Sequence, residues 1–181
     1  LTISLRPEVL TEVAEDIFRS LITHNIKRIL AIIGHDGNIE PVAVACRNIK
    51  RQYKDVVIAV FEAWWWTAAR QLGKGFFDVW DGLGHGGEGE TSLMMALLPE
   101  LVDFDEAKKA PIIVPNIPDG EVRIMWNFRE LSHLGYTGAP SKATPEKGKK
   151  MVEVLTDYLV KFLKKMDEIN WDYAIKIGKL E

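Results

Sequence analysis

The sequence predicts an α/β fold: a single layered domain, residues 1–181, in which helices flank a mostly parallel sheet. Two observations favour this class. Short runs of β-branched residues alternate with amphipathic stretches of helical periodicity, as expected where strands alternate with helices. The length of 181 residues suits one domain with a sizeable core, and no repeat, low-complexity tract or linker divides the chain.

The first third of the chain predicts a helix followed by a βαβ unit. Apolar residues recur on one face from Pro7 to His24, which indicates a helix whose proline lies in the first turn. Buried strands are expected at Lys27–Ile33 and Val56–Phe61. Between them, Asn38 is placed to cap a helix over Ile39–Tyr53. Strand, helix and strand in this order predict a parallel pair.

The remainder of the chain predicts further helices and few strands. An apolar helix is expected at Leu93–Leu98. Three prolines make Ala110–Asp119 a loop or an edge segment, and Val122–Phe128 is a candidate strand. Thr144 is placed as the cap of a long final helix, Pro145–Asp167.

Composition and charge exclude several classes of function. The net charge is −3 and no basic run occurs outside the final helix, so nothing favours nucleic acid as a partner. Cys46 is the single cysteine, which excludes an internal disulfide and suits a reducing cytoplasm. No apolar stretch reaches the ~18 residues that a membrane span needs. We therefore expect a cytoplasmic protein without a membrane partner.

The segment Asp81–Ser92 concentrates groups that can perform chemistry. It holds five glycines, one histidine and two glutamates, directly before an apolar stretch. Glycines permit positive φ and close approach of other groups, and a histidine with carboxylates on such a loop indicates metal ligation or proton transfer. A second segment, Gly34–Asn38, has the same character and follows a predicted strand, where open α/β sheets place their sites. We predict that the two loops face each other across one site.

Structural roles remain open for some of these residues. The N-terminus of a helix stabilises carboxylates by itself, so Glu88 and Glu90 are also candidates for helix capping. His85 is also a candidate for a hydrogen-bonded loop histidine. The match of Gly82–Gly87 to G-x-G-x-x-G does not indicate a dinucleotide site, because the two glutamates would put negative charge where phosphates must lie.

Three adjacent tryptophans follow the second predicted strand. Trp64, Trp65 and Trp66 cannot all point inward from one helix or strand, so at least one is expected to be partly exposed. They form either core and interface packing or an aromatic wall over a pocket. Trp80, next to the glycine-rich loop, is a further candidate for that wall.

Three segments in order carry a family resemblance: I-I-G-H-D-G-N (32–38), H-G-G-E-G-E-T-S-L-M-M-A-L-L-P-E-L-V (85–102) and G-Y-T-G-A-P-S-K-A-T-P-E-K-G (135–148). They resemble the creatininase (creatinine amidohydrolase) family signatures N-G-H-x-x-N, H-A-G-E-x-E-T-S and G-x-x-G-x-P-x-x-A-T. The resemblance covers nearly the whole chain. It implies an α/β fold with a parallel sheet and a divalent metal centre, usually of two ions, that hydrolyses an amide C–N bond.

The resemblance also implies roles for individual residues. His35 matches the metal-binding histidine, Glu90 matches the glutamate at or beside the metals, and His85 matches the histidine that acts on the substrate as acid or base. His85 and Glu90 are thus the catalytic candidates, and His35 and Glu90 the metal ligands. The candidate substrate contacts are Asp36, Trp64, Trp65, Trp66, Trp80 and Glu88.

Two departures from the family pattern bear on the metal centre. Creatininase has a metal-binding glutamate where this chain has Gly37, which leaves specificity for creatinine open. The family's other ligands, a Glu-x-His pair and an Asp, lie N-terminal to the position of Leu1. A catalytic zinc needs about three protein ligands, so we expect the C-terminal portion of a longer domain. The missing N-terminal segment, on the same or a separate chain, is expected to complete the centre.

The expected function is metal-dependent hydrolysis of a small, non-peptide amide. A metal-bound hydroxide attacks the carbonyl and His85 passes a proton to the leaving nitrogen. Zinc is the expected metal, with iron or manganese as alternatives, and the family commonly forms hexamers. A Lys- and Glu-rich composition indicates a thermophilic source and favours one alternative, the archaeal formylamino-pyrimidine nucleotide deformylase of flavin-type cofactor synthesis. A metal-free scaffold or binding protein on the same fold is the alternative of another class.

Overall fold

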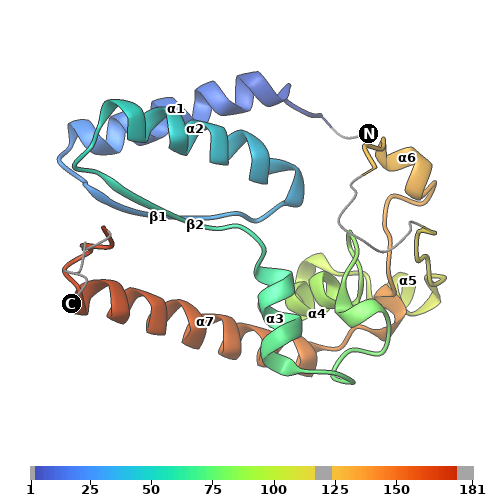
Figure 1. Cartoon of the computed structure of the whole chain (residues 1–181). Helices are drawn as coiled ribbons and strands as arrows, with labels where there is room; N and C mark the ends of the chain where they lie inside the picture. Colours follow the sequence, from blue (N-terminus) through green and yellow to red (C-terminus); the bar gives the residue numbers. More distant parts are fainter. Residues whose placement is uncertain (1–2, 117–123, 175–181) are drawn as a thin grey trace, which may run out of the picture. The chain divides into compact units, whose positions relative to one another are not determined.

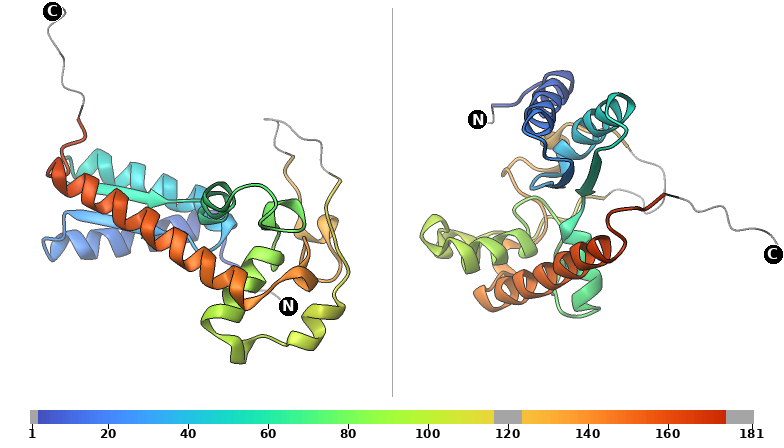
Figure 2. Two further views of the ribbon diagram at one scale, coloured as in Figure 1. Left: turned by 90° about the horizontal axis from the view of Figure 1, so that it is seen from below. Right: turned by 90° about the vertical axis from the view of Figure 1, so that its left-hand side faces the viewer.

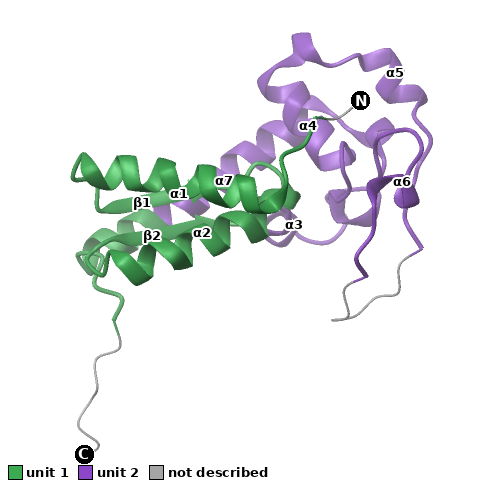
Figure 3. Ribbon diagram, turned by 90° about the horizontal axis from the view of Figure 1, so that it is seen from above, with its two compact units in different colours: residues 1–64, 162–181 green, residues 65–161 purple. Residues whose placement is uncertain are grey.

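The computed structural model describes residues 3–116 and 124–174 (Figure 1). The chain divides into two compact units, one of residues 1–64 and 162–181 and the other of residues 65–161 (Figure 3). Because each unit is described by itself, the single domain expected from the sequence stays a prediction.

The first unit contains the predicted βαβ element. Helix α1 (Pro7–Thr23) is followed by strand β1 (Arg28–Ile32), helix α2 (Ile39–Gln52) and strand β2 (Val57–Phe61). The two strands pair in parallel, with Arg28 opposite Val57 and Ile32 opposite Phe61. The helix and strand predictions for residues 7–61 are therefore confirmed to within one or two residues at each end.

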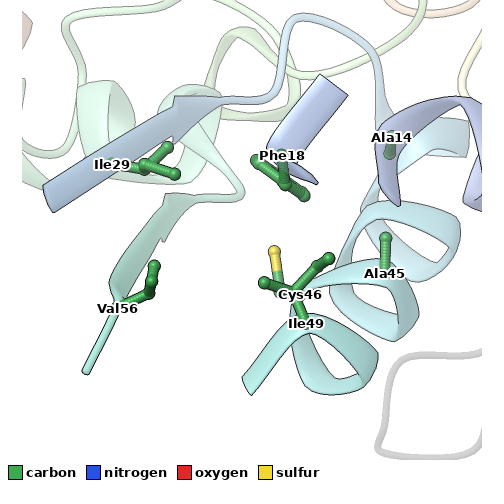
Figure 4. Packing of buried hydrophobic residues seen from close by; sticks show 7 residues of the cluster. All are labelled: Ala14, Phe18, Ile29, Ala45, Cys46, Ile49 and Val56. Atoms are coloured by element: carbon green, nitrogen blue, oxygen red, sulfur yellow. The ribbon is translucent and has the colours of Figure 1, made fainter. Parts of the chain in front are cut away.

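The core of this unit lies between the two helices and one face of the strands. Phe18 of α1, Ile49 of α2 and Ile29 of β1 are buried there (Figure 4), and α1 and α2 lie side by side over the strands (Figures 1 and 2). Buried strands were expected, but the strands are only partly buried: Ile29 is the buried residue of β1, and all five residues of β2 are half-buried. The helices cover one face of this two-stranded sheet, and a parallel strand is fully buried only where both faces of its sheet are covered.

The start of α2 differs from the prediction. Asn38 makes no side-chain capping bond, because its backbone is already helical at φ −91° and ψ −10°, whereas a capping residue needs an extended backbone. Asn38 instead ends a 3₁₀ turn, Asp36–Asn38, and its N–H donates to the carbonyl of His35 at 3.0 Å.

In its described part the second unit is built from short helices, loops and most of a long helix, α7 (Pro145–Glu168). Helix α4 (Glu88–Leu97) begins five residues before the predicted start. The strand expected at 122–128 is wrong where it is described: residues 124–127 lie in no strand and Phe128 begins a helix. Residues 110–116 form the expected loop, which touches Gly138 through an isolated bridge at Ile113. The other helices are α3 (Trp64–Leu72), α5 (Phe104–Lys109), α6 (Phe128–Leu131) and α7 (Pro145–Glu168).

Helix α7 begins as the sequence predicts. The Thr144 side chain accepts the N–H of Lys147 at 3.2 Å and so caps the helix. Short 3₁₀ turns at Trp80–Gly82, Pro99–Leu101 and Pro140–Lys142 connect the longer elements. Over the described residues, no helix combines the length and the apolar character needed to cross a membrane.

Gly148 lets α7 approach the backbone of α4. A Cβ atom at Gly148 would lie 1.9 Å from the carbonyl oxygen of Ser92, a fully buried residue of α4 whose hydroxyl accepts the N–H of Thr144 at 3.1 Å. Glycine is therefore required at this crossing for contact reasons, although it is a poor helix former.

We expect Gly148→Ala to lower the free energy of unfolding by about 1–3 kcal/mol, the usual cost of overpacking. Alanine is about 1 kcal/mol better than glycine within a helix, but the clash with backbone outweighs that gain. Urea denaturation measures the effect. Lys149→Ala, at the next and exposed position of α7, is the matched control, and equal stability of the two variants would contradict the close approach.

Candidate functional site

The glycine-rich loop (residues 82–87) has a backbone that few other sequences would adopt. Gly82, Gly84 and Gly86 have φ values of +75°, +109° and +58°. At Gly84 a Cβ atom would also lie 2.5 Å from the carbonyl oxygen of Thr137. The glycines thus allow the loop's positive φ values and let the backbone at Thr137 pack directly against the loop.

Thr137 fixes His85 at both backbone groups. The N–H of His85 donates to the Thr137 hydroxyl at 3.0 Å, and the N–H of Thr137 donates to the carbonyl of His85 at 2.8 Å. Thr137 is buried, whereas His85 is exposed. The segments 85–92 and 135–144, distant in the sequence, therefore form one structure that holds the backbone of His85 and leaves its side chain accessible.

Glu90 lies in the first turn of α4, where the helix dipole stabilises its charge. Its carboxylate accepts the N–H of Gly86 at 2.6 Å, and the neighbouring Thr91 hydroxyl donates to the Gly86 carbonyl at 2.9 Å. Glu90 makes no side-chain capping bond to α4; its bond runs back from the first turn to the glycine-rich loop. A carboxylate has about four acceptor positions, so this bond is compatible with metal ligation by the same group.

The imidazole of His85 contacts an aromatic side chain that sequence reasoning missed. The ring centroids of His85 and Phe128 are 4.9 Å apart, with an angle of 69° between the planes. Phe128 in turn contacts Trp126 at 6.4 Å and 62°. From its sequence, the stretch that contains Trp126 and Phe128 was interpreted as a strand, and no sequence signal indicated that it would contact His85.

The carboxylate of Glu88 is held by partners inside the second unit. Glu88 is fully buried, and its carboxylate accepts the N–H of Asp78 at 3.0 Å and that of Val79 at 3.0 Å. It also forms an ion pair with Lys147 of α7. These partners give Glu88 the structural role that the sequence left open, and its contact with a substrate stays a prediction.

Lys147 joins two carboxylates, and we call Asp78, Glu88 and Lys147 the Lys147 ion network. Burial opposes the charge of Lys147, but hydrogen bonds with Asp78 and Glu88 outweigh it and raise the pKa of the ammonium group. The hydrogen bond from Lys147 lowers the pKa of Asp78. The network therefore ties both ends of residues 78–88 to α7.

The second predicted loop lies in the first unit. His35 and Asp36 are exposed just after β1. The imidazole of His35 lies over Gly37, because a Cβ atom at that position would be 3.0 Å from its Nε2 atom. Since His35 belongs to one unit and Glu90 to the other, their predicted meeting around a metal stays a prediction.

The tryptophans divide between packing and exposure. Trp64 is buried, which confirms a packing role for one of the three, whereas Trp66 is 50% and Trp80 43% exposed. Trp65 is half-buried. An aromatic wall stays a prediction for the more exposed members.

The described residues do not form a complete metal site. Within residues 3–116 and 124–174, no group of three or more His, Cys, Asp or Glu side chains could hold a metal ion. His35 and Glu90 are two candidate ligands, fewer than the three that a catalytic zinc usually has. The part of the chain that the structure describes therefore does not show, by itself, the centre that the resemblance implies.

Comparison with known proteins decides the family. The profile of the creatininase family, described as creatinine amidohydrolase, matches residues 1–163. The chain belongs to the creatininase family. The three signature segments thus correctly indicated it.

Two curated relatives are similar over part of their length. Creatinine amidohydrolase of Pseudomonas putida is 34% identical over 119 residues, which are 61% of this chain and 45% of that protein. Mycofactocin precursor peptide peptidase of Mycobacterium ulcerans (strain Agy99) is 26% identical over 135 residues, 72% of this chain and 45% of that protein. The chain thus spans about half the length of the curated relatives that it matches.

Solved creatininases share the fold. A creatinine amidohydrolase (creatininase) structure matches with a TM-score of 0.73 at 25% identity, over 91% of this chain and 65% of that chain. A manganese creatininase matches with a TM-score of 0.67 at 27% identity, over 91% and 66% of the two chains. A mutant creatininase of Zn–Zn type has a TM-score of 0.66 at 27% identity, with the same coverage. The α/β fold expected from the sequence is thereby confirmed as that of a creatininase.

Proposed function

We propose that this creatininase-family chain is part of an amidohydrolase that cleaves a small, non-peptide amide at its C–N bond. The observation that carries the proposal is the loop of His85, whose backbone is held at both polar groups by Thr137 while the imidazole stays exposed. Histidine changes charge near neutral pH and is the commonest side chain in general acid–base catalysis. Similarity to creatinine amidohydrolase supports this class of reaction.

In this proposal His85 donates a proton to the leaving nitrogen of the amide. Glu90 holds the loop through the N–H of Gly86 and keeps its remaining acceptor positions for a cation. The candidates for contact with a flat substrate are the exposed side chains of Asp36, Trp66 and Trp80 and the half-buried side chain of Trp65.

A divalent metal would act as a Lewis acid and lower the pKa of a coordinated water. The candidate ligands of this chain are His35 and Glu90. We propose zinc, with iron or manganese as alternatives and two ions in the complete protein; the Zn–Zn and manganese forms of related creatininases support a divalent cation. The other ligands would come from a preceding segment, on the same or a separate chain, and the complete protein would be a cytoplasmic homo-oligomer.

A peptide amide is the second candidate bond, because a mycofactocin precursor peptide peptidase is also a relative. The formylamino-pyrimidine deformylase and the metal-free scaffold stay alternatives.

The test is an assay of the purified protein, with any polypeptide that copurifies, after loading with zinc or manganese. Creatinine, a formamido-pyrimidine nucleotide and a short peptide are the substrates.

We expect hydrolysis of a non-peptide amide that a chelator abolishes and added metal restores. His35→Ala should lower the bound metal, whereas His24→Ala, an exposed histidine at the end of α1, should not. Cleavage of the peptide alone would favour the peptidase. A metal-loaded protein that cleaves no amide, or a preparation that binds no metal, would overturn the proposal and favour the scaffold.

A further inference from the structure

Three aromatic side chains form a row at the glycine-rich loop. The rings of His85 and Phe128 are 4.9 Å apart and those of Phe128 and Trp126 are 6.4 Å apart, both in edge-to-face arrangements. None of the three belongs to a buried core: Phe128 is half-buried, Trp126 is 44% exposed and His85 is exposed. The row therefore extends from the imidazole to a solvent-accessible indole.

The position of Phe128 is set by local hydrogen bonds. Asn127 and Glu130 form a capping box: the Asn127 side chain accepts the N–H of Arg129 at 3.2 Å, and Glu130 accepts the N–H of Asn127 at 2.7 Å. The N–H of Ser132 donates to the carbonyl of Phe128 at 3.1 Å. These bonds hold the backbone of Phe128 at the first position of the short helix α6.

The two hydrogen bonds with Thr137 involve the backbone of His85 and not its imidazole. The ring of Phe128 contacts the imidazole itself, and edge-to-face aromatic pairs are favourable at this separation. An exposed tryptophan beyond it contributes a large apolar face with few internal rotations, which suits a planar group of a ligand.

We propose that Phe128 positions the imidazole of His85 and that Trp126 determines specificity by stacking against a flat, cyclic amide. The inference rests on the proposed amidohydrolase function and names a substrate class for it. Phe128 acts through His85 and is a positioning residue, whereas Trp126 touches the substrate itself.

The positioning part is tested without any substrate. The ring C–H resonances of His85, assigned with His85→Gln, are compared by NMR in the wild type and in Phe128→Leu. Loss of the nearby ring current should shift these resonances, whereas Met125→Ala, at an 80% exposed neighbour, should leave them in place. Unchanged His85 resonances in Phe128→Leu would overturn the positioning role.

The specificity part is tested by kinetics of the metal-loaded protein. Aromatic pairs contribute about 0.5–1.5 kcal/mol, which corresponds to about a two- to tenfold change. Trp126→Ala should raise KM for creatinine by that factor with little change in kcat, Trp126→Phe should restore most of the loss, and a flexible linear amide should be unaffected. Phe128→Leu should instead lower kcat with little change in KM.

Failure of this inference is distinguishable from failure of the proposed function. If the wild type hydrolyses amides but Trp126→Ala matches it on cyclic and linear substrates, the specificity role of Trp126 is wrong and the amidohydrolase assignment stands. If the wild type hydrolyses no amide, creatinine is titrated against the His85 resonances. Weaker binding in Trp126→Ala than in Met125→Ala would support the stacking role, and equal or absent binding would overturn it.

Discussion

Replacing Lys147 with methionine is expected to lower the free energy of unfolding by about 3–5 kcal/mol. The side chain of Glu88 is fully buried and that of Lys147 is 17% exposed, so removing the ammonium group leaves a buried carboxylate without its opposite charge. The two backbone N–H groups that Glu88 accepts, from Asp78 and Val79, offset only part of that cost. Urea denaturation, with the midpoint and the slope fitted separately, measures the change.

Lys150→Met is the matched control, because Lys150 lies on the same helix and pairs with Glu153 at an exposed site. Surface pairs of this kind contribute about 0–1 kcal/mol. The double variant Lys147→Met with Glu88→Gln removes both charges of the buried pair. It should recover part of the lost stability, as expected for coupled residues. If Lys147→Met is no less stable than Lys150→Met, the ion pair with buried Glu88 does not stabilise the fold.

The pH dependence of the Lys147 ion network follows from its pKa shifts. The lowered pKa of Asp78 means that its contribution is present above the pKa of the unfolded chain and is lost as the pH falls through the folded value. The raised pKa of Lys147 means the opposite: its contribution is present below the unfolded value and is lost as the pH rises through the folded one. The network is therefore intact at neutral pH, where the glycine-rich loop that it flanks would act.

Hydrophobic periodicity was sufficient for residues 7–61. Long amphipathic and β-branched segments carry their own signal, so the order and limits of α1, β1, α2 and β2 followed from the sequence. The start of α4 did not, because Glu88, Gly89 and Glu90 lack apolar periodicity and glycine disfavours helices. Their helical state depends on partners elsewhere in the chain, such as the N–H of Asp78 and the ammonium group of Lys147.

The roles of polar and aromatic residues were harder to predict than the elements. Glutamates are seldom fully buried, so Glu88 in a motif beside His85 was interpreted as a site residue; its ion-pair partner lies 59 positions away. Phe128 and Trp126 lie in a stretch rich in strand-forming residues. The pair Asn127 and Glu130 is a capping-box pattern that indicates a helix start, and it was the signal available for α6.

The second large effect is expected on catalysis: His85→Gln should lower kcat for amide hydrolysis by about 10²–10⁴, the usual contribution of a general acid or base. Glutamine cannot provide a proton as imidazole does. The loop should persist in the variant, because its bonds to Thr137 involve the backbone of residue 85 and not its side chain.

Single-turnover rates, metal content and the unfolding midpoint are measured together on the metal-loaded protein. His133→Gln is the control, since His133 is also exposed and follows α6 in the same unit. A fall in kcat at unchanged metal content and stability, absent from His133→Gln, would assign the proton transfer to His85. Wild-type kcat in His85→Gln would show that His85 takes no part in the reaction.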